Sequence, residues 1–520
     1  MSSKSMDVDE ILTQIGGYGY FQKRQTLILG LVIFVLTFQP LIMVFIGAEV
    51  PWRCTSNSTC RHNGTIEPTN SHYEDRCKLN RTDWQYVDKF TSITSEWDLI
   101  CGREVYASLS QSILFIGWIP GAFLIGRLSD RFGRTKVLFP AAAVVAVSAL
   151  ASSFTHVLWL FLLLRATIGF FQGGTFVILY VLSTEFVGPE HRSLAGTLNW
   201  VFFCVSLMVL DGLAYGIRNW RHLSIATSAP ALPLILLWWW VPESSRWNLL
   251  HNKEKEARKT FAMIAKLNNK SLEIDHLADN NIEEKNDEEP GGIIDLFRPK
   301  QQLMKTVILW VAWFTNSMVY YGVTLSSGAL GGSLYLNFFL TSLVELPANF
   351  FAIWFMDQYK CKLFGLFGRK RALVLGLVLA SIFCVVVSVV PQTEGNIGFQ
   401  AIKILAAVLG KFSISISFCT IYVASVEVLP TIIRNVGLGS MAAFDQFGAS
   451  IAPFVVLLNK THPVLPFVLM ALTAFVAGFL SWLVLPETLG QHTLETLADR
   501  NSEDKQAGLA QETETMDYQF

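Results

Sequence analysis

The chain has 520 residues, of which 52% are hydrophobic and only 16% charged, and its formal net charge at pH 7 is −1. Soluble domains carry about 25% charged residues, so this composition excludes an ordinary soluble protein and favours one polytopic membrane bundle. The nearly neutral charge gives no support for nucleic acid as a partner. The first 25 residues are polar and charged, and no cleavable signal peptide is expected.

Apolar runs recur along the whole chain. A helix needs roughly 20 apolar residues to cross the hydrocarbon core. Twelve runs meet that length, at 26–46, 106–125, 137–154, 158–181, 195–217, 223–241, 305–323, 333–356, 372–390, 402–426, 436–458 and 463–485. The predicted fold is therefore an all-α membrane protein with twelve transmembrane helices. Its expected segments are a cytoplasmic start (1–25), a six-helix half (26–241), a cytoplasmic loop (242–304), a second six-helix half (305–485) and a cytoplasmic tail (486–520).

The loop between the first two spans, residues 49–103, is large and is predicted to be extracellular. An even number of cysteines in an oxidising compartment predicts two disulfides, and the sequence leaves their pairing open. The four are Cys54, Cys60, Cys77 and Cys101. The same loop holds three acceptor triplets for N-glycosylation, at Asn57, Asn63 and Asn80.

Positive residues gather on the opposite side, in the turn 126–136 and in 360–371, and the segment 243–304 is charged throughout. The positive-inside rule assigns this side, and with it both termini, to the cytoplasm. Within 243–304, the part 253–268 has helix-forming character, whereas 275–292 is acidic and typical of a flexible linker. The terminal residues 518–520 weakly suit capture by a scaffold protein that binds carboxyl termini.

The two halves repeat one another. A Glu precedes an Arg by seven residues after span four and again after span ten, and spans six and twelve both end in Pro-Glu. Such a bundle works by rocking one half against the other around a central site, and charges that pair when the halves close on the cytoplasmic side would form a gate. The alternative is static helix capping and anchoring. The predicted gate residues are Asp130, Arg131, Arg134, Glu185, Arg192, Asp357, Arg369, Glu427 and Arg434.

At these positions the chain resembles the major facilitator superfamily, and within it the organic cation, anion and zwitterion transporters (solute carrier family 22-like). The resemblance spans nearly the whole chain. It rests on the segments 96–101, 126–136, 183–188, 242–247, 313–316 and 427–435, together with the first loop. It implies polyspecific movement of small organic ions across a plasma membrane, with no cofactor and no enzyme activity. One departure is the longer turn that follows Asp357, which makes the second copy of the gate motif irregular.

Charged residues inside predicted spans are costly, about 2.5–3.5 kcal/mol each on insertion scales, so each suggests a functional role. They are Arg165, Asp211, Glu345, Lys411 and Asp445. We expect Arg165 near the cytoplasmic end of its span, where it resembles an arginine of the superfamily that serves structure or coupling. Lys411 is expected near the extracellular end of span ten, where snorkelling offers an alternative to ligand binding.

The resemblance focuses the substrate question on spans ten and eleven. Cation-handling members carry an acid where this chain has Cys419, and an acid where it has Gln446; anion and carnitine members carry arginine at the latter position. This chain has neither, although Asp445 directly precedes Gln446. Asp211 and aromatic rings favour an ammonium group. The predicted substrate-binding residues are Asp211, Tyr320, Tyr321, Lys411, Cys419, Tyr422, Asp445 and Gln446, with Trp313 as a further candidate ring.

These residues favour organic cations and carnitine-like or betaine-like zwitterions as substrates. The alternatives are an organic anion transporter and a receptor-like member of the fold that has lost transport. A channel is disfavoured because the sequence lacks a repeated pore loop, and a metalloenzyme or an ATP-driven pump because it lacks the corresponding motifs. The sequence leaves open the exact substrate, ion coupling, direction of flux and oligomeric state.

Overall fold

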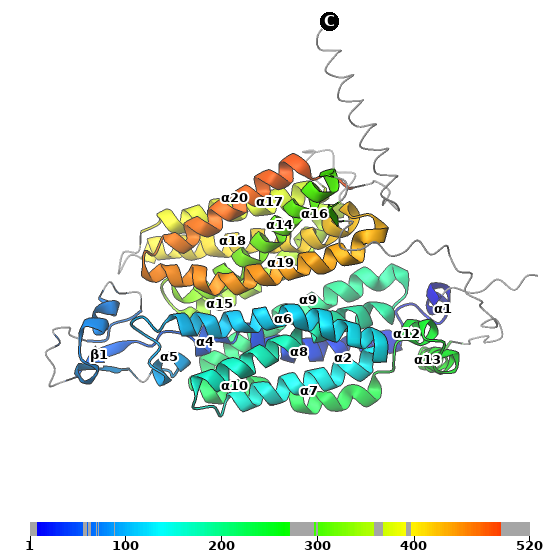
Figure 1. The fold of residues 1–520 in the computed structure, drawn as a ribbon, viewed down its shortest axis with the longest axis horizontal. Helices are drawn as coiled ribbons and strands as arrows, with labels where there is room; N and C mark the ends of the chain where they lie inside the picture. The colour runs from blue at the N-terminus through cyan, green and yellow to red at the C-terminus, as the bar shows by residue number, and fades with distance from the viewer. Residues whose placement is uncertain are drawn as a thin grey trace, which may run out of the picture.

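The computed structural model of the chain describes residues 8–55, 60, 64–68, 70, 72–87, 89–270, 296–297, 300–357, 368–391 and 397–489. Its helices form two bundles that lie one above the other in Figure 1, the N-terminal bundle below and the C-terminal bundle above. One end of the molecule carries a small disulfide-bonded subdomain, and we call it the disulfide end. The other carries the turns at Gly133 and Gly368, and we call it the turn end.

Eleven stretches of the described residues are long and apolar enough to cross a membrane. Helix α14 (Lys300–Leu325) is not among them, because its middle carries Thr315, Asn316 and Ser317. It nevertheless packs along α18, α19 and α20 like its neighbours, so we count it as the twelfth spanning helix.

The N-terminal bundle begins with α2 (Tyr20–Leu36), which continues through the short α3 (Phe38–Leu41) and α4 (Met43–Ile46). It therefore starts six residues before the predicted span. The next helices are α6 (Val105–Phe132), α7 (Arg134–Ser152), α8 (Leu158–Glu185) and α9 (Arg192–Gly216), the last preceded by η3 (Pro189–His191). The sixth crossing is broken into α10 (Trp220–Ser228), α11 (Ala231–Leu234) and η4 (Ile235–Trp240). Pro230 and Pro233 explain the breaks, because proline has no N–H to donate to the preceding turn.

The C-terminal bundle follows the same plan. After α14 and η7 (Ser326–Gly328) come α15 (Leu334–Leu343), α16 (Glu345–Asp357), α17 (Arg369–Val389), α18 (Ile397–Val428), α19 (Thr431–Leu457), η8 (Leu458–Lys460) and α20 (Leu465–Val484). The eighth crossing is interrupted between α15 and α16. Pro347 cannot bond the carbonyl of Leu343, so the helix breaks at Glu345, a buried acid.

The subdomain at the disulfide end is built on β1 (Trp52–Cys54) and β2 (Trp84–Tyr86), which pair antiparallel with Trp52 opposite Tyr86. The short helices η1 (Tyr73–Lys78), η2 (Arg81–Asp83) and α5 (Ile93–Glu96) accompany them. Trp52, Tyr73 and Trp84 form part of its core. The prediction of two disulfides is confirmed, and the structure pairs Cys54 with Cys60 and Cys77 with Cys101.

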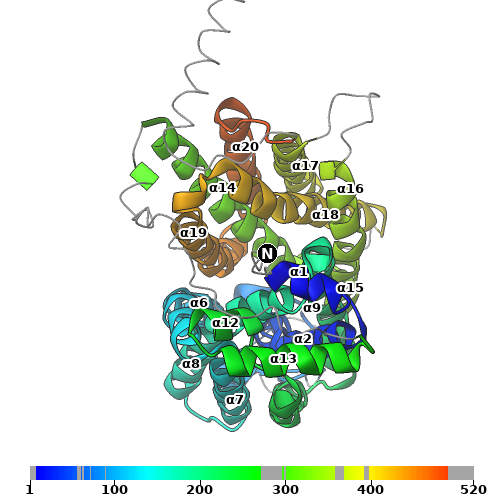
Figure 2. The ribbon, with the colours of Figure 1, turned by 90° about the vertical axis from the view of Figure 1, so that its right-hand side faces the viewer.

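At the turn end, three short helices cover the N-terminal bundle, as Figure 2 shows: α1 (Val8–Gln14), α12 (Ser245–Leu250) and α13 (Glu254–Leu267). The helix predicted at 253–268 is present as α13. Asp9 of α1 accepts from both Arg192 and Arg246, which fastens the N-terminal segment to the loop between the halves. The predicted acidic linker, 275–292, and the residues 518–520 lie outside the described part of the chain.

Candidate functional site

The two halves meet along α6 and α19 on one side and along α9, α15 and α16 on the other. Rings from both halves gather between them. We call this set the aromatic cluster, and it consists of Phe115, Trp200, Trp313, Tyr320, Tyr321, Phe418 and Tyr422. The ring centroids of Trp313 and Tyr422 are 4.4 Å apart, and those of Phe115 and Tyr321 are 4.7 Å apart across the interface between the halves. Trp200 and Phe418 were not predicted, because nothing in the sequence distinguishes them from lipid-facing rings.

Lys411 lies beside this cluster and is paired with Glu345. Its Nζ is 3.0 Å from Glu345 Oε1, and the two side chains are 0% and 4% exposed. Tyr320 donates its hydroxyl to Glu345 Oε2 over 2.8 Å. Our placement of Lys411 near the end of its span is therefore wrong, and the snorkelling alternative does not hold. The side chain stays inside the bundle because Glu345, fixed at the break between α15 and α16, neutralises it there.

The pair reaches across to the N-terminal half through Cys204 of α9. Its thiol donates to Glu345 Oε2 over 3.5 Å, and Asn349 Nδ2 donates to the same sulfur over 3.8 Å. Glu345 is thus in contact with both halves. The sequence singles out Glu345 as an intramembrane charge but gives no signal that Lys411 is its partner, since the two are 66 residues apart.

Asp445 of α19 is the acid that lies against the cluster without a basic partner. It is 5% exposed, and Gln446 Nε2 donates to its Oδ2 over 2.8 Å. The Ser317 hydroxyl is the other polar group nearby, but Oδ1 makes no hydrogen bond of good geometry among the described residues. Tyr321 lies within electrostatic reach of both Asp445 and Glu345, and Tyr422 within reach of Asp445. A buried carboxylate with a free oxygen beside aromatic faces is an arrangement that suits an organic cation.

Asp211 of α9 lies away from this group, toward the disulfide end. It is 6% exposed and its Oδ1 has no hydrogen-bond partner in the described residues. Tyr215, one turn further along, packs edge-on against Tyr335 of the other half, with ring centroids 5.5 Å apart. Cys419 is a free cysteine that packs against α16, beside the cluster.

Arg165 holds the N-terminal bundle together. It donates to the backbone carbonyls of Gln39 (2.9 Å) and Ser110 (3.2 Å) and to Gln111 Oε1 (3.1 Å), so it ties α3 and α6 to α8. It lies near the start of α8, on the disulfide side, and our placement of it near the cytoplasmic end is wrong. Neutral acceptors around a fully buried guanidinium indicate a structural role.

The turn end repeats one arrangement in each half. Gly133 and Gly368 have φ of 118° and 141°, a conformation that favours glycine, and each precedes the first residue of a helix. Glu243 Oε1 accepts from the N–H of Arg134 over 2.8 Å, and Glu487 Oε1 accepts from the N–H of Arg369 over 2.7 Å. The two Pro-Glu ends recognised in the sequence are therefore helix caps.

The predicted gate residues at this end pair mostly inside their own half. Arg134 pairs with Asp130 and lies 3.6 Å from Glu185, and Arg369 lies 3.1 Å from Glu427. The remaining partners are Asp9 for Arg192, the carbonyl of Leu429 for Arg434 and the ring of Phe132 for Arg131. The side chain of Asp357 lies outside the described residues. Pairing of the gate residues between the two halves stays a prediction, for a conformation in which the halves close at the turn end.

At the disulfide end a lysine joins the halves. Lys460, at the end of η8, lies 2.6 Å from Glu49, 3.3 Å from Glu74 and 3.4 Å from Glu104. The three acids belong to the N-terminal half and its subdomain. Ser108 also donates to the carbonyl of Pro453 across the interface, over 3.3 Å. We call Lys460 with its three acids the lock. No sequence pattern indicates this cluster, because its four residues are far apart in the chain and lie at the ends of helices and in loops.

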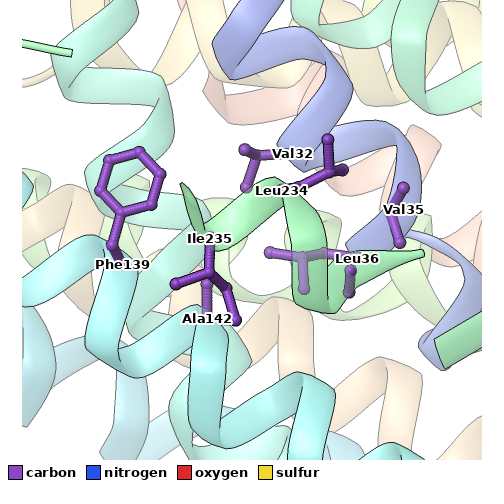
Figure 3. A pocket seen from close by; sticks show the side chains of 8 residues that line it. Val32, Val35, Leu36, Phe139, Ala142, Leu234 and Ile235 are labelled. Atoms are coloured by element: carbon purple, nitrogen blue, oxygen red, sulfur yellow. The ribbon is translucent and has the colours of Figure 1, made fainter. Parts of the chain in front are cut away.

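Two hollows lie outside the interface between the halves. The first, of about 10 Å³, is an apolar crevice between α2, α7, α11 and η4 (Figure 3), lined by Val32, Val35, Leu36, Phe139, Ala142, Ala231, Leu234 and Ile235. It has room for at most about one water molecule, and its apolar walls offer no polar partner. The second, of about 400 Å³, lies at the disulfide end and is lined by Trp97, Arg103, Tyr106, His156, Val157, Leu158 and Trp159. Neither contains the candidate site residues.

Comparison with known proteins identifies the family. The sequence model of the family described as "Sugar (and other) transporter" matches residues 55–498. The organic cation/carnitine transporter 4 of Arabidopsis thaliana is 32% identical over 94% of this chain and 90% of its own length. Human solute carrier family 22 member 13 is 30% identical over 94% and 92%, and the Drosophila melanogaster organic cation transporter protein is 29% identical over 95% and 94%.

Solved structures show the same fold. The inward-open xylose transporter XylE from E. coli superimposes with a TM-score of 0.63 and 17% sequence identity, over 91% of this chain and 98% of that one. A partially occluded inward-open form of the same transporter gives a TM-score of 0.62. The family model, the relatives and the two-half architecture of twelve helices agree. The chain belongs to the major facilitator superfamily, and within it to the organic cation, anion and zwitterion transporters of the solute carrier family 22 type.

Proposed function

We propose that the protein carries small organic cations and zwitterions across the plasma membrane by alternating access. The ammonium group of the substrate binds at Asp445, and the aromatic cluster encloses it. The observation that carries the proposal is the free Oδ1 of Asp445, on a buried carboxylate with no basic partner in the described residues. The names of the relatives support organic ions as the substrate class.

The chemistry favours a cation at this place. A buried carboxylate is costly unless it is paired, and a substrate ammonium supplies the missing partner. Each aromatic face adds roughly 0.5–2 kcal/mol of attraction for a quaternary ammonium. Gln446 holds Asp445 through Oδ2 and leaves Oδ1 to the substrate. The family's acid and arginine are both absent from position 446, and Asp445 takes over the cation-binding role from the adjacent position.

A zwitterion is accommodated by the same site. Its ammonium group binds at Asp445, and its carboxylate faces the neutral pair of Lys411 with Glu345, beside Tyr320. A simple organic anion is a weaker candidate, because Lys411 is already engaged by Glu345 and the free group beside the cluster is acidic. This electrostatic difference favours cations and zwitterions over anions.

Alternating access follows from the distribution of contacts. The disulfide end, which we assign to the extracellular side, is held shut by the lock. The turn end, which we assign to the cytoplasm together with both termini, has ion pairs inside each half. The described conformation is therefore closed to the outside. Opening to the outside requires Lys460 to leave its acids and the gate residues of the turn end to meet across the interface.

Uptake into cells tests the proposal. Three labelled probes, tetraethylammonium, L-carnitine and para-aminohippurate, are compared at matched surface expression. Saturable uptake of the first two is expected, and Asp445→Asn should reduce both strongly. Asp98→Asn is the matched control, because it removes an exposed acid of the extracellular loop that pairs with Arg81. Uptake of para-aminohippurate alone, or unchanged cation uptake by Asp445→Asn, would overturn the proposal, and absence of any uptake would favour the receptor-like alternative.

A further inference from the structure

Three ionisable groups lie around Tyr320 and Tyr321: Asp445, Glu345 and Lys411. Tyr321 is within electrostatic reach of both acids, and Lys411 Nζ lies over the ring of Tyr320. The rings of the two tyrosines are in contact, with centroids 5.2 Å apart. A substrate that touches the pair of tyrosines therefore meets the summed charge of all three groups. With both acids and the lysine ionised, that sum is one negative charge.

Lys411 is held in place by two hydrogen bonds and one ion pair. Its Nζ donates to Thr324 Oγ1 over 2.7 Å and to the carbonyl of Tyr320 over 3.2 Å, and its third contact is Glu345 at 3.0 Å. Glu345 Oε1 meets the charge of Nζ without a hydrogen bond of good geometry, so this third contact is an ion pair. Removing either member of a buried pair leaves an uncompensated charge, which is strongly unfavourable. The pair therefore behaves as a fixed neutral unit, and Lys411 occupies the place beside Glu345 that a second substrate cation would need.

We propose that the Lys411–Glu345 pair determines how many positive charges a substrate must carry to be accepted at the site. Glu345 is neutralised from within the protein, so Asp445 alone is left to the substrate, and the site selects organic ions with one cationic centre over dications. This inference rests on the proposed transport function and narrows its substrate class.

The arrangement predicts opposite changes for the two members of the pair. In Lys411→Met the pair loses its cation, and two carboxylates, Glu345 and Asp445, face the substrate. In Glu345→Gln the pair loses its anion, and one carboxylate and one ammonium face the substrate, which is the charge pattern complementary to a zwitterion. In the double variant the pair is again neutral, as in the natural chain. A merely structural pair would not reorder substrates in this way.

The experiment measures kcat/KM for uptake of a monocation (tetraethylammonium), a dication (paraquat) and a zwitterion (L-carnitine) at matched surface expression. Lys411→Met should raise the paraquat-to-tetraethylammonium ratio about tenfold, and Glu345→Gln should raise the carnitine-to-tetraethylammonium ratio about tenfold, since a contact with a charged group is worth about that factor or more. The double variant should return both ratios to within about threefold of the natural values. Cys384→Ser, a buried change outside the cluster, is the control.

Each outcome decides the matter. Changes that affect all three probes by the same factor, or a double variant that keeps the dication preference of Lys411→Met, would overturn the inference while leaving transport itself intact. If a single variant does not reach the cell surface, the double variant is tested instead. An order of kcat/KM for the three probes that differs from the order in the natural chain then refutes the proposal. Failure of the transport function is separate: the natural chain would then take up none of the three probes, or Asp445→Asn would leave uptake unchanged.

Discussion

Replacing Lys460 with alanine is expected to shift the protein toward the state that is open to the outside. Lys460 is 23% exposed, and it is the described residue that links η8 of the C-terminal half to Glu49, Glu74 and Glu104. Without it, the two halves lose three charge contacts at the disulfide end. The three carboxylates would also repel one another in the closed state, so the closed state is penalised twice.

The size of the free-energy shift caused by Lys460→Ala follows from how exposed the three acids are. Glu74 is 44% exposed and contributes little, whereas Glu49 and Glu104 are 26% and 16% exposed. Partly exposed ion pairs are worth roughly 0.2–1 kcal/mol each, and the repulsion among the acids adds to that. We expect a shift of about 2 kcal/mol, which corresponds to about a 30-fold change in the ratio of open to closed protein.

Thiol labelling reports this ratio. Ser108→Cys places a cysteine where α6 meets Pro453 of the other half, so a membrane-impermeant maleimide reaches it faster when the disulfide end opens. The labelling rate should rise by about the same 30-fold factor when Lys460→Ala is added. Lys89→Ala is the matched control, because it removes a lysine that pairs with Glu67 of the same extracellular region. Equal labelling of the Lys460→Ala and Lys89→Ala proteins would refute the lock.

Three further predictions concern the two ends of the molecule. Asp130→Ala should impair uptake more than surface expression, because Arg134 loses a partner while its helix cap from Glu243 remains; equal loss of both would support the anchoring interpretation. Cys77→Ser with Cys101→Ser opens a bridge with a sequence separation of 24 and should lower the stability of the extracellular subdomain by about 3 kcal/mol, seen as reduced surface expression and a lower melting temperature. Burial opposes ionisation of Glu104, but Lys460 and the N–H of Gly102 outweigh it and lower its pKa from 4.5. Because the pKa of Glu104 is lowered in the closed state, its ionised carboxylate stabilises that state at pH values above the ordinary pKa. This stabilisation is lost as the pH falls through the lowered pKa. Ser108→Cys labelling, measured relative to the Lys460→Ala protein, should therefore stay constant between about pH 8 and pH 5.

The helices were predictable because their signal is local. Apolar runs of the required length stand out in any window of the sequence, and both half-repeats carry the same Pro-Glu and Glu-to-Arg spacings. The breaks at Pro230, Pro233 and Pro347 were missed because hydropathy averages over them. The pairing of the four loop cysteines was also undetermined, since four cysteines allow three connectivities.

The site was predicted as a set of residues but not as a set of contacts. Tyr320, Tyr321, Tyr422 and Asp445, which the sequence offers as candidates, lie near one another, and their role in binding a substrate stays a prediction. The partners of the charged residues depend instead on tertiary packing. The pairing of Lys411 with Glu345 cannot be computed from sequence spacing, which therefore leaves the snorkelling alternative open. Arg165 lies at the disulfide side of its span, and the order of the spans along the chain already indicates that side.

Several contacts of the turn end occur once in each half. The cap from Glu243 to Arg134 recurs as the cap from Glu487 to Arg369, and the pair of Arg134 with Glu185 recurs as the pair of Arg369 with Glu427. Each of these contacts lies inside one half, so the repeat builds two rigid bodies of similar design.

The charged contacts that cross the interface have no such copies among the described residues. Lys460 meets its three acids at the disulfide end, and Glu345, neutralised by Lys411, meets Cys204 at the centre. Because rigid halves store little of the free-energy difference between the two states, that difference must reside in these crossing contacts. A substrate that changes the balance at Glu345 and Asp445 therefore acts on the same interface that Lys460 holds closed. The effects of Lys460→Ala and of the Lys411–Glu345 variants on the free energy of opening to the outside should add only if the two sites are independent. Non-additive labelling of Ser108→Cys would show that substrate charge and the lock are coupled through the rocking of the halves.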